Sequence, residues 1–190
     1  MVVVIHADGA HLTLVRHGES DWNVERLVQG QNNRSRLTAV GREQARGVAV
    51  TLAPHRYERL VSSDLARARD TAAIIGAALS LEVHEDARLR ERGFGDLEGG
   101  PSSGLTSTVT GIVEEVLVDP DCRAPGGESF RDVVERARST MESLDERWPR
   151  QRVLVVTHGV MFRAMVAHRT GAPLEGLAWG TVKNCSVRAI

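Results

Sequence analysis

The stretch Leu12–Ser20, with the sequence LTLVRHGES, decides the fold of this chain. Its first four residues are apolar or β-branched and predict a short buried strand. The strand ends directly at Arg16, His17 and Gly18. An arginine offers a rigid fork of donors that suits a phosphate group, a histidine is a nucleophile or proton carrier near neutral pH, and a glycine lets a ligand approach the backbone. Taken alone, these three residues fit a phosphate site and an ordinary surface loop about equally well.

A second stretch, Arg152–Gly159 (RVLVVTHG), repeats this design. It is an apolar, β-branched run that ends in His158 and Gly159, and an amphipathic segment follows. In an open α/β sheet, ligands bind outside the carboxyl ends of the strands. Because His17 and His158 both follow such ends, we expect them to face one pocket although they are far apart in the sequence.

The composition predicts a single globular domain over residues 1–190. The chain has 190 residues, of which 42% are hydrophobic and 26% charged, and its net charge is −1. These values are typical of a soluble domain with a sizeable core. The balanced charge gives no reason to expect nucleic acid or a membrane surface as a partner. Cys122 and Cys185 lack the spacing of a metal site or a disulfide framework.

The start of the chain does not read as a secretory segment. Met1–Ile5 is followed by His6 and Asp8 rather than by a small-residue cleavage site. No apolar run is long enough to span a bilayer. We therefore expect a cytoplasmic protein. His6 and His11 are interpreted as incidental neighbours of His17, because a metal site needs a defined ligand set and geometry.

Four motifs resemble the histidine phosphatase superfamily, which includes the phosphoglycerate mutases and many phosphatases. They are Arg16-His17-Gly18, residues 63–68 (SDLARA), residues 89–95 (LRERGFG) and residues 157–159 (THG), and they follow the order of that family. The resemblance implies an α/β fold, a three-layer α/β/α sandwich with a mostly parallel central sheet as in the phosphoglycerate mutases.

Helix and strand signals agree with this fold class. Thr38 and Asp64 are candidate N-caps for helices that run to Leu52 and Leu79. Apolar residues recur at helical spacing over residues 129–148, and residues 159–167 predict a further helix. The remaining expected strands are residues 57–61, 81–84 and 182–190.

The resemblance assigns roles to the candidate site residues. His17 would be the nucleophile, and Glu91 would be the general acid and base. Arg16, Arg67 and His158 would form a phosphate cradle, a role that suits their side chains because a guanidinium fork binds two phosphate oxygens. Since the positive charge is built in, we expect no metal and no cofactor. The residues expected to line the substrate pocket are Gly18, Asn23, Gln29, Gly30 and Gly159.

Several of these positions have alternatives that the sequence leaves open. Arg69 competes with Arg67 as the second arginine, and Asp96 and Glu98 compete with Glu91 as the acid. Each of these charged residues also fits a solvated surface. Asn23 is either a residue of the phosphate pocket, the interpretation we favour, or a turn residue that bonds its own backbone.

Residues 101–128 are the part least like the family. In the family this region forms a lid that carries much of the substrate selectivity. Here it is short and polar, with one expected helix over residues 112–118. It contains no aromatic or basic cluster that would select a substrate. Glu128, at its end, is either a ligand-side residue or part of the first turn of the next helix.

Three functions follow from these observations. The first is a phosphatase acting on a small phosphorylated metabolite, as a monomer or homodimer. The second is phosphotransfer of the phosphoglycerate mutase type, which usually needs a longer lid and an ordered tail. The third is a non-catalytic module that binds a phosphorylated ligand. The short lid favours hydrolysis, and the joint presence of His17, Arg67, Glu91 and His158 argues against a decayed site.

Overall fold

A computed structural model describes residues 8–102, 119–172 and 182–190 of the chain. In this part, five strands form one sheet in the order β3-β2-β4-β1-β5. The first four strands run parallel, and β5 pairs antiparallel with β1. The strands are β1 (His11–Arg16), β2 (Arg59–Ser62), β3 (Val83–Glu85), β4 (Arg152–Thr157) and β5 (Val187–Ala189).

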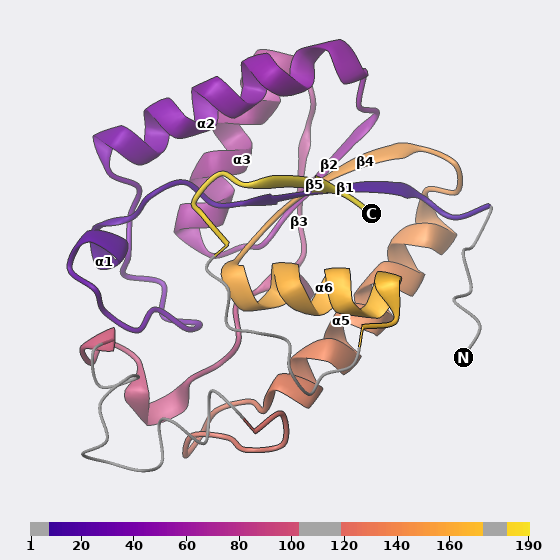
Figure 1. Cartoon of the computed structure of the whole chain (residues 1–190). Helices are drawn as coiled ribbons and strands as arrows, with labels where there is room; N and C mark the ends of the chain where they lie inside the picture. The colour runs from indigo at the N-terminus through magenta and orange to yellow at the C-terminus, as the bar shows by residue number, and fades with distance from the viewer. Residues whose placement is uncertain (1–7, 103–118, 173–181) are drawn as a thin grey trace.

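Helices cover both faces of the sheet (Figure 1). Helices α2 and α3 pack together on one face, and α5 and α6 pack together on the other. The predicted three-layer α/β/α sandwich is therefore confirmed. The helices are α1 (Asp21–Val24), α2 (Ala39–Leu52), α3 (Ala66–Leu79), α5 (Phe130–Arg147) and α6 (Gly159–Thr170), with short 3-10 turns η1 (Ala53–His55), η2 (Ala87–Leu89) and η3 (Gly95–Leu97).

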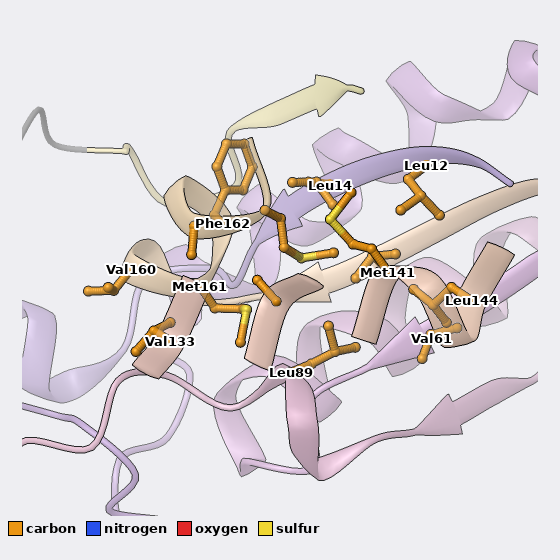
Figure 2. Close-up of a cluster of buried hydrophobic side chains, with 14 of the residues drawn as sticks. Leu12, Leu14, Val61, Leu89, Val133, Met141, Leu144, Val160, Met161 and Phe162 are labelled. Atoms are coloured by element: carbon orange, nitrogen blue, oxygen red, sulfur yellow. The ribbon is translucent and has the colours of Figure 1, made fainter. Parts of the chain in front are cut away.

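The alternation of side chains along the central strands divides the core in two. Leu12 and Leu14 of β1 face α5 and α6, where they join Met141 and Met161 in the larger cluster (Figure 2). Val15 faces the other way and packs with the smaller cluster under α2 and α3. Successive strand residues point to opposite faces, so a strand that is apolar on both sides must lie between two helical layers.

The predicted helix boundaries agree closely with the structure. Thr38 caps α2 by accepting the N–H of Gly41, and α2 ends at Leu52 as expected. Ser129 caps α5, because its side chain accepts the backbone N–H of Asp132. The side chain of Asp132 in turn accepts the backbone N–H of Ser129. The final strand is shorter than expected, because only residues 187–189 pair with β1. The helix expected over residues 112–118 lies outside the described residues, as does His6.

The predicted cap of α3 was wrong. Leu65, not Asp64, is the N-cap residue of α3, and its side chain makes no capping bond. Asp64 instead receives two hydrogen bonds from the guanidinium of Arg90, one of them 2.7 Å long. The first N–H of α3, that of Ala66, donates to Oδ1 of Asn33 at 2.7 Å. A side chain far away in sequence therefore takes over the capping role, which no local pattern predicts.

Two glycines allow the loop after β1 to contact α2. A Cβ atom on Gly18 would lie 2.4 Å from the carbonyl oxygen of Gly41, and one on Gly41 would lie 2.0 Å from the carbonyl oxygen of Glu19. The backbones therefore approach as closely as they do only because both residues lack side chains. Backbone packing is therefore one reason for glycine at position 18, and the expected approach of a ligand to Gly18 stays a prediction.

We expect Gly41→Ala to lower the free energy of unfolding by roughly 2–3 kcal/mol, since the added methyl group would overlap backbone that has no room to move. Gly47→Ala on the same helix is the matched control. No atom lies within 4 Å of a Cβ built there, so helix propensity alone should raise stability by up to about 1 kcal/mol. Denaturant unfolding of both variants measures the difference. Equal effects would mean that the close contact with residue 19 does not constrain the fold.

Candidate active site

The two histidines lie together because their strands are parallel neighbours. In the β1–β4 pair, Arg16 is opposite Thr157, so the residue after each strand is a histidine. The N–H of His17 extends the ladder by donating to the carbonyl oxygen of Thr157 at 2.9 Å. The ring centroids of His17 and His158 are 5.2 Å apart with an angle of 57° between the rings. Both rings are buried. The expectation that the two histidines lie close together is confirmed, and their role in one binding site stays a prediction.

The hydrogen bonding of His17 determines its tautomer. Nδ1 lies 2.7 Å from the carbonyl oxygen of Gly18. A carbonyl oxygen can only accept, so Nδ1 carries the hydrogen and Nε2 keeps its lone pair. Burial, followed by the charges of Arg67 and Arg16, holds the pKa of His17 well below its usual value. The ring is therefore neutral, with a nucleophilic nitrogen on the side away from Gly18.

Two arginines bring positive charge to this pair of histidines. Arg67 is fully buried on the first turn of α3 and donates to the carbonyl oxygens of Gly30 at 2.8 Å and Asn32 at 3.1 Å. Burial lowers the pKa of Arg67 to about 10, so the group stays charged at neutral pH. Arg16 donates from Nη1 to the carbonyl oxygen of Val182. Arg69 is exposed, which favours Arg67 as the second arginine.

The guanidinium groups and the second histidine each retain a buried nitrogen without a partner. Within residues 8–102, 119–172 and 182–190, Nε of Arg16, Nε of Arg67 and Nδ1 of His158 have no hydrogen-bond partner. Buried polar atoms are almost always paired, so an unpaired group in a native fold requires an explanation. These three nitrogens belong to the three residues that the sequence assigned to a phosphate cradle.

Glu91 is held at the N-terminus of α6. Its Oε1 accepts the N–H groups of Arg92 and Val160, both at 3.0 Å, and lies 3.4 Å from the N–H of Met161. Helix N-termini favour negative charge. A Cβ on Gly159 would lie 3.6 Å from Oε2 of Glu91 and 3.7 Å from Nε of Arg16. Gly159 therefore occupies the narrow space between the candidate acid and the cradle.

The competing carboxylates have other roles in the structure. Oε1 of Glu98 accepts the N–H groups of Gln31 at 2.8 Å and Phe94 at 2.9 Å, so it joins two loops. A Cβ on Gly30, whose φ is +49°, would lie 2.0 Å from the same Oε1. Asp96 is exposed. Of the three candidates, Glu91 is the one whose carboxylate lies beside Arg16.

The other predicted pocket residues support the loop that carries His17. Oδ1 of Asn23 accepts the backbone N–H of Ser20 at 3.1 Å and Nδ2 of Asn184 at 3.1 Å. Oε1 of Gln29 accepts the hydroxyl of Ser20 at 3.1 Å. The N–H of Gly18 donates to Oγ1 of Thr71 at 3.1 Å and is therefore already used. Asn23 is therefore the third residue of α1 and part of a capping box with Ser20, not a turn residue that bonds its own backbone. A direct contact of any of these residues with a substrate stays a prediction.

Several residues that support the site were missed by the sequence analysis. Arg136 on α5 forms a two-pronged ion pair with Glu128 and also donates to the carbonyl oxygens of Arg90 at 2.8 Å and Glu91 at 3.3 Å. This pair braces the backbone around Glu91. Asn184 donates to the carbonyl oxygen of His17 at 3.1 Å. The sequence placed Arg136 in the expected helix over residues 129–148 and Asn184 in the expected strand over residues 182–190, and neither placement reveals the distant partner.

Arg163 is a further cation that the sequence analysis missed. It follows Gly159 by one turn of α6, and burial lowers its pKa whereas the charge of Glu91 raises it. Its charge also lowers the pKa of Arg16. Glu91 is therefore surrounded by several cations. Among the residues that the structure describes, no three His, Cys, Asp or Glu side chains converge as a metal site.

Comparison with known proteins identifies the family. Fold and site define an α/β protein with two histidines at the carboxyl ends of neighbouring parallel strands. The chain belongs to the histidine phosphatase superfamily (branch 1), whose family model matches residues 12–190. It is accordingly related to phosphatases and mutases that act on phosphate groups. Across the described residues, no helix is both long and apolar enough to cross a membrane.

Relatives of both kinds are similar to this chain. It is 36% identical over 178 residues to "Probable phosphoglycerate mutase GpmB" from Salmonella choleraesuis, covering 93% of this chain and 82% of the relative. A mycobacterial glucosyl-3-phosphoglycerate phosphatase, solved with VO3, has a TM-score of 0.85 and 33% identity, covering 94% of this chain and 89% of the other. Phosphoserine phosphatase from Entamoeba histolytica has a TM-score of 0.81, and at 23% identity it shows the fold alone, with 94% and 88% of the two chains covered.

The depressed pKa values of His17 and His158 predict how stability depends on pH. Burial is the largest cause for both rings, followed by the charge of Arg67. The unfolded chain then binds protons near the ordinary histidine pKa of about 6.5, whereas the folded chain does not. Above about pH 6.5 the two histidines do not reduce the free energy of unfolding, because they are neutral in both states. As the pH falls below that value, the free energy of unfolding decreases, because protons bind to the unfolded chain alone. The slope is at most about 1.4 kcal/mol per pH unit for each ring.

Urea unfolding in phosphate-free buffer between about pH 7.5 and about pH 5.5 measures this slope. His17→Asn and His158→Asn should each reduce the slope by the contribution of one proton. If both variants lose stability with the same slope as the wild type, the two rings are not held neutral by the fold.

Proposed function

We propose that the protein hydrolyses a small phosphomonoester, without a metal ion, through a phosphohistidine on Nε2 of His17. The observation that carries this proposal is the set of buried nitrogens without partners on Arg16, Arg67 and His158, around a histidine that is held neutral. A phosphate group supplies acceptor oxygens for such donors. The similarity to phosphatases supports hydrolysis as the reaction class.

The first step transfers the phosphoryl group to the enzyme. The lone pair on Nε2 of His17 attacks phosphorus in line with the leaving oxygen, and the bond from phosphorus to that oxygen breaks. The Nδ1–H of His17 keeps its bond to the carbonyl oxygen of Gly18, so that carbonyl stabilises the positive charge that forms on the ring. Arg16 and Arg67 balance the charge on the phosphoryl oxygens. Glu91, which takes up a proton when the negatively charged substrate binds beside it, gives that proton to the leaving alkoxide.

The second step releases phosphate. Glu91, now a carboxylate, takes a proton from a water molecule, and the water oxygen attacks phosphorus. The bond from phosphorus to Nε2 breaks, and His17 regains its lone pair. Splitting one difficult displacement into two easier ones is the advantage of a covalent intermediate.

The experiment that tests the proposal is release of phosphate from a generic aryl phosphate in excess chelator. We expect wild-type turnover to survive the chelator and His17→Ala to abolish it. Rapid quenching with a radiolabelled substrate should trap one acid-labile phosphoryl group on Nε2 of His17. Turnover that needs a metal ion, or that persists in His17→Ala, would contradict the proposal.

Glu91→Gln tests the acid separately. The variant keeps the shape of the side chain and removes the proton, so hydrolysis of an alkyl phosphate should fall by roughly 10²- to 10⁴-fold. An activated aryl phosphate needs no proton on its leaving oxygen and should lose far less in the first step. Asp96→Asn is the matched control, because Asp96 is an exposed carboxylate of the same loop. Because loss of the base would slow the second step for both substrates, the comparison uses the first step, measured as the burst of released alcohol or phenol in rapid-quench experiments. Equal losses of that burst rate on both substrates would remove Glu91 from the role of acid.

Phosphotransfer of the phosphoglycerate mutase type is the second candidate, and the 36% identity to a protein named as a mutase favours it. Such a mutase returns the phosphoryl group to the product instead of to water. Isomerisation of phosphoglycerate after priming with a bisphosphate, faster than release of phosphate, would identify the mutase. Binding of inorganic phosphate with no phosphohistidine and no turnover would instead identify a non-catalytic binding module.

A further inference from the structure

The second histidine of the site is held by a serine that the proposed mechanism does not use. Nε2 of His158 lies 2.8 Å from Oγ of Ser63, and both residues are fully buried. Ser63 follows β2, and its N–H donates to the carbonyl oxygen of Val156 at 3.0 Å, so its position is fixed by the sheet. The serine and the histidine therefore meet through the pairing of β2 with β4.

The donor in the contact between Ser63 and His158 can be inferred from the other hydrogen bonds of the two side chains. Oγ of Ser63 is 3.3 Å from the N–H of Leu65, which can only donate, so this contact uses a lone pair of the serine oxygen. In the part of the chain that the structure describes, Nε2 of His158 is the other polar atom in contact with this hydroxyl, so it is the acceptor that the hydroxyl hydrogen of Ser63 can reach. If Nε2 accepts it, the hydrogen of a neutral ring must be on Nδ1. Across the described residues, Nδ1 is the buried nitrogen of His158 that has no partner.

We propose that Ser63 is the positioning residue of His158: its hydroxyl donates to Nε2, holds the ring in the neutral Nδ1–H tautomer, and so directs an N–H at a phosphoryl oxygen. This inference rests on the proposed function, because it takes phosphate as the ligand of Nδ1. In the opposite tautomer, Nδ1 would present a lone pair to an oxygen that is itself rich in electrons. That arrangement repels the ligand, so the direction of one buried hydroxyl decides whether His158 assists or opposes phosphate binding.

The environment of His158 leaves the neutral ring as the relevant form. Burial, followed by the charges of Arg67, His17 and Arg16, lowers the pKa of His158 well below its usual value. A neutral imidazole has one hydrogen for two nitrogens, and the bond made by one nitrogen determines the state of the other. His17 is set in the same manner by the carbonyl oxygen of Gly18, but with the opposite result for the ligand. One ring offers a lone pair to phosphorus and the other offers a hydrogen to oxygen.

The test reads the tautomer directly. Long-range ¹H–¹⁵N correlation spectra of protein labelled with ¹⁵N-histidine, saturated with inorganic phosphate, distinguish the two neutral tautomers, and His158→Asn assigns the signal. We expect the Nδ1–H form in the wild type. In Ser63→Ala the signal should shift toward the Nε2–H form, and the inhibition constant of inorganic phosphate should rise by roughly 10- to 100-fold, the cost of a misdirected bond to a charged group.

Two further variants control the experiment. Ser63→Thr keeps a hydroxyl at the same place and should restore both the tautomer and phosphate binding. Ser62→Ala removes the neighbouring buried hydroxyl, which donates to the carbonyl oxygen of Ser63 at 2.9 Å and does not contact His158. It should leave the tautomer of His158 and the inhibition constant unchanged.

A wild-type His158 in the Nε2–H form with phosphate bound would overturn the proposal, even if Ser63→Ala does not fold. An unchanged tautomer and inhibition constant in Ser63→Ala would do so as well. These outcomes are separate from the failure of the proposed function. That failure appears as the absence of a phosphohistidine on His17, whereas the tautomer is read without turnover.

Discussion

The parallel pairing of β1 with β4 is the constraint on which the rest of the structure depends. Its register places Arg16 opposite Thr157, and the N–H of His17 then donates to the carbonyl oxygen of Thr157. A shift by one residue would turn Leu12 and Leu14 away from α5 and α6, because side chains alternate between the two faces. The apolar core therefore fixes the distance between the two histidines, and the site inherits the rigidity of the sheet.

The pairing of β1 with β4 brings buried positive charge next to the two histidines, and burial of a charge is unfavourable. Arg67 is buried against backbone carbonyl oxygens, and the carboxylate of Glu91 is held by backbone N–H groups of α6. Neither charge is neutralised by a direct contact with the other. Ion pairs in the interior neutralise both partners, and a neutralised cradle would attract an anion weakly. Backbone carbonyl oxygens satisfy two hydrogen bonds of Arg67 without neutralising its positive charge, as the proposed phosphate site requires.

The sequence predicted the parts of the fold and site that depend on local pattern. Periodicity and capping residues predicted the central strands, α2 with its Thr38 cap, and α5. The position of both His-Gly pairs directly after predicted strands indicated that the two histidines lie at the same edge of the sheet. The missed features depend on partners distant in sequence. Asn33 caps α3, Arg136 braces the segment of Glu91, and Ser63 contacts His158. A single sequence carries no signal for which distant side chain fills such a place.

The glycines of the site show how packing and chemistry are linked. The missing side chain of Gly18 makes room for the backbone of Gly41, which lets α2 contact the loop of His17, and the expected contact of Gly18 with a ligand stays a prediction. Gly159 differs, because a side chain there would extend toward both Glu91 and Arg16. Gly18 therefore lets α2 contact the loop of His17, and Gly159 leaves the space between Glu91 and Arg16 free of a side chain. The two His-Gly motifs are alike in sequence, but the structure shows that their glycines have different neighbours and therefore different reasons to lack a side chain.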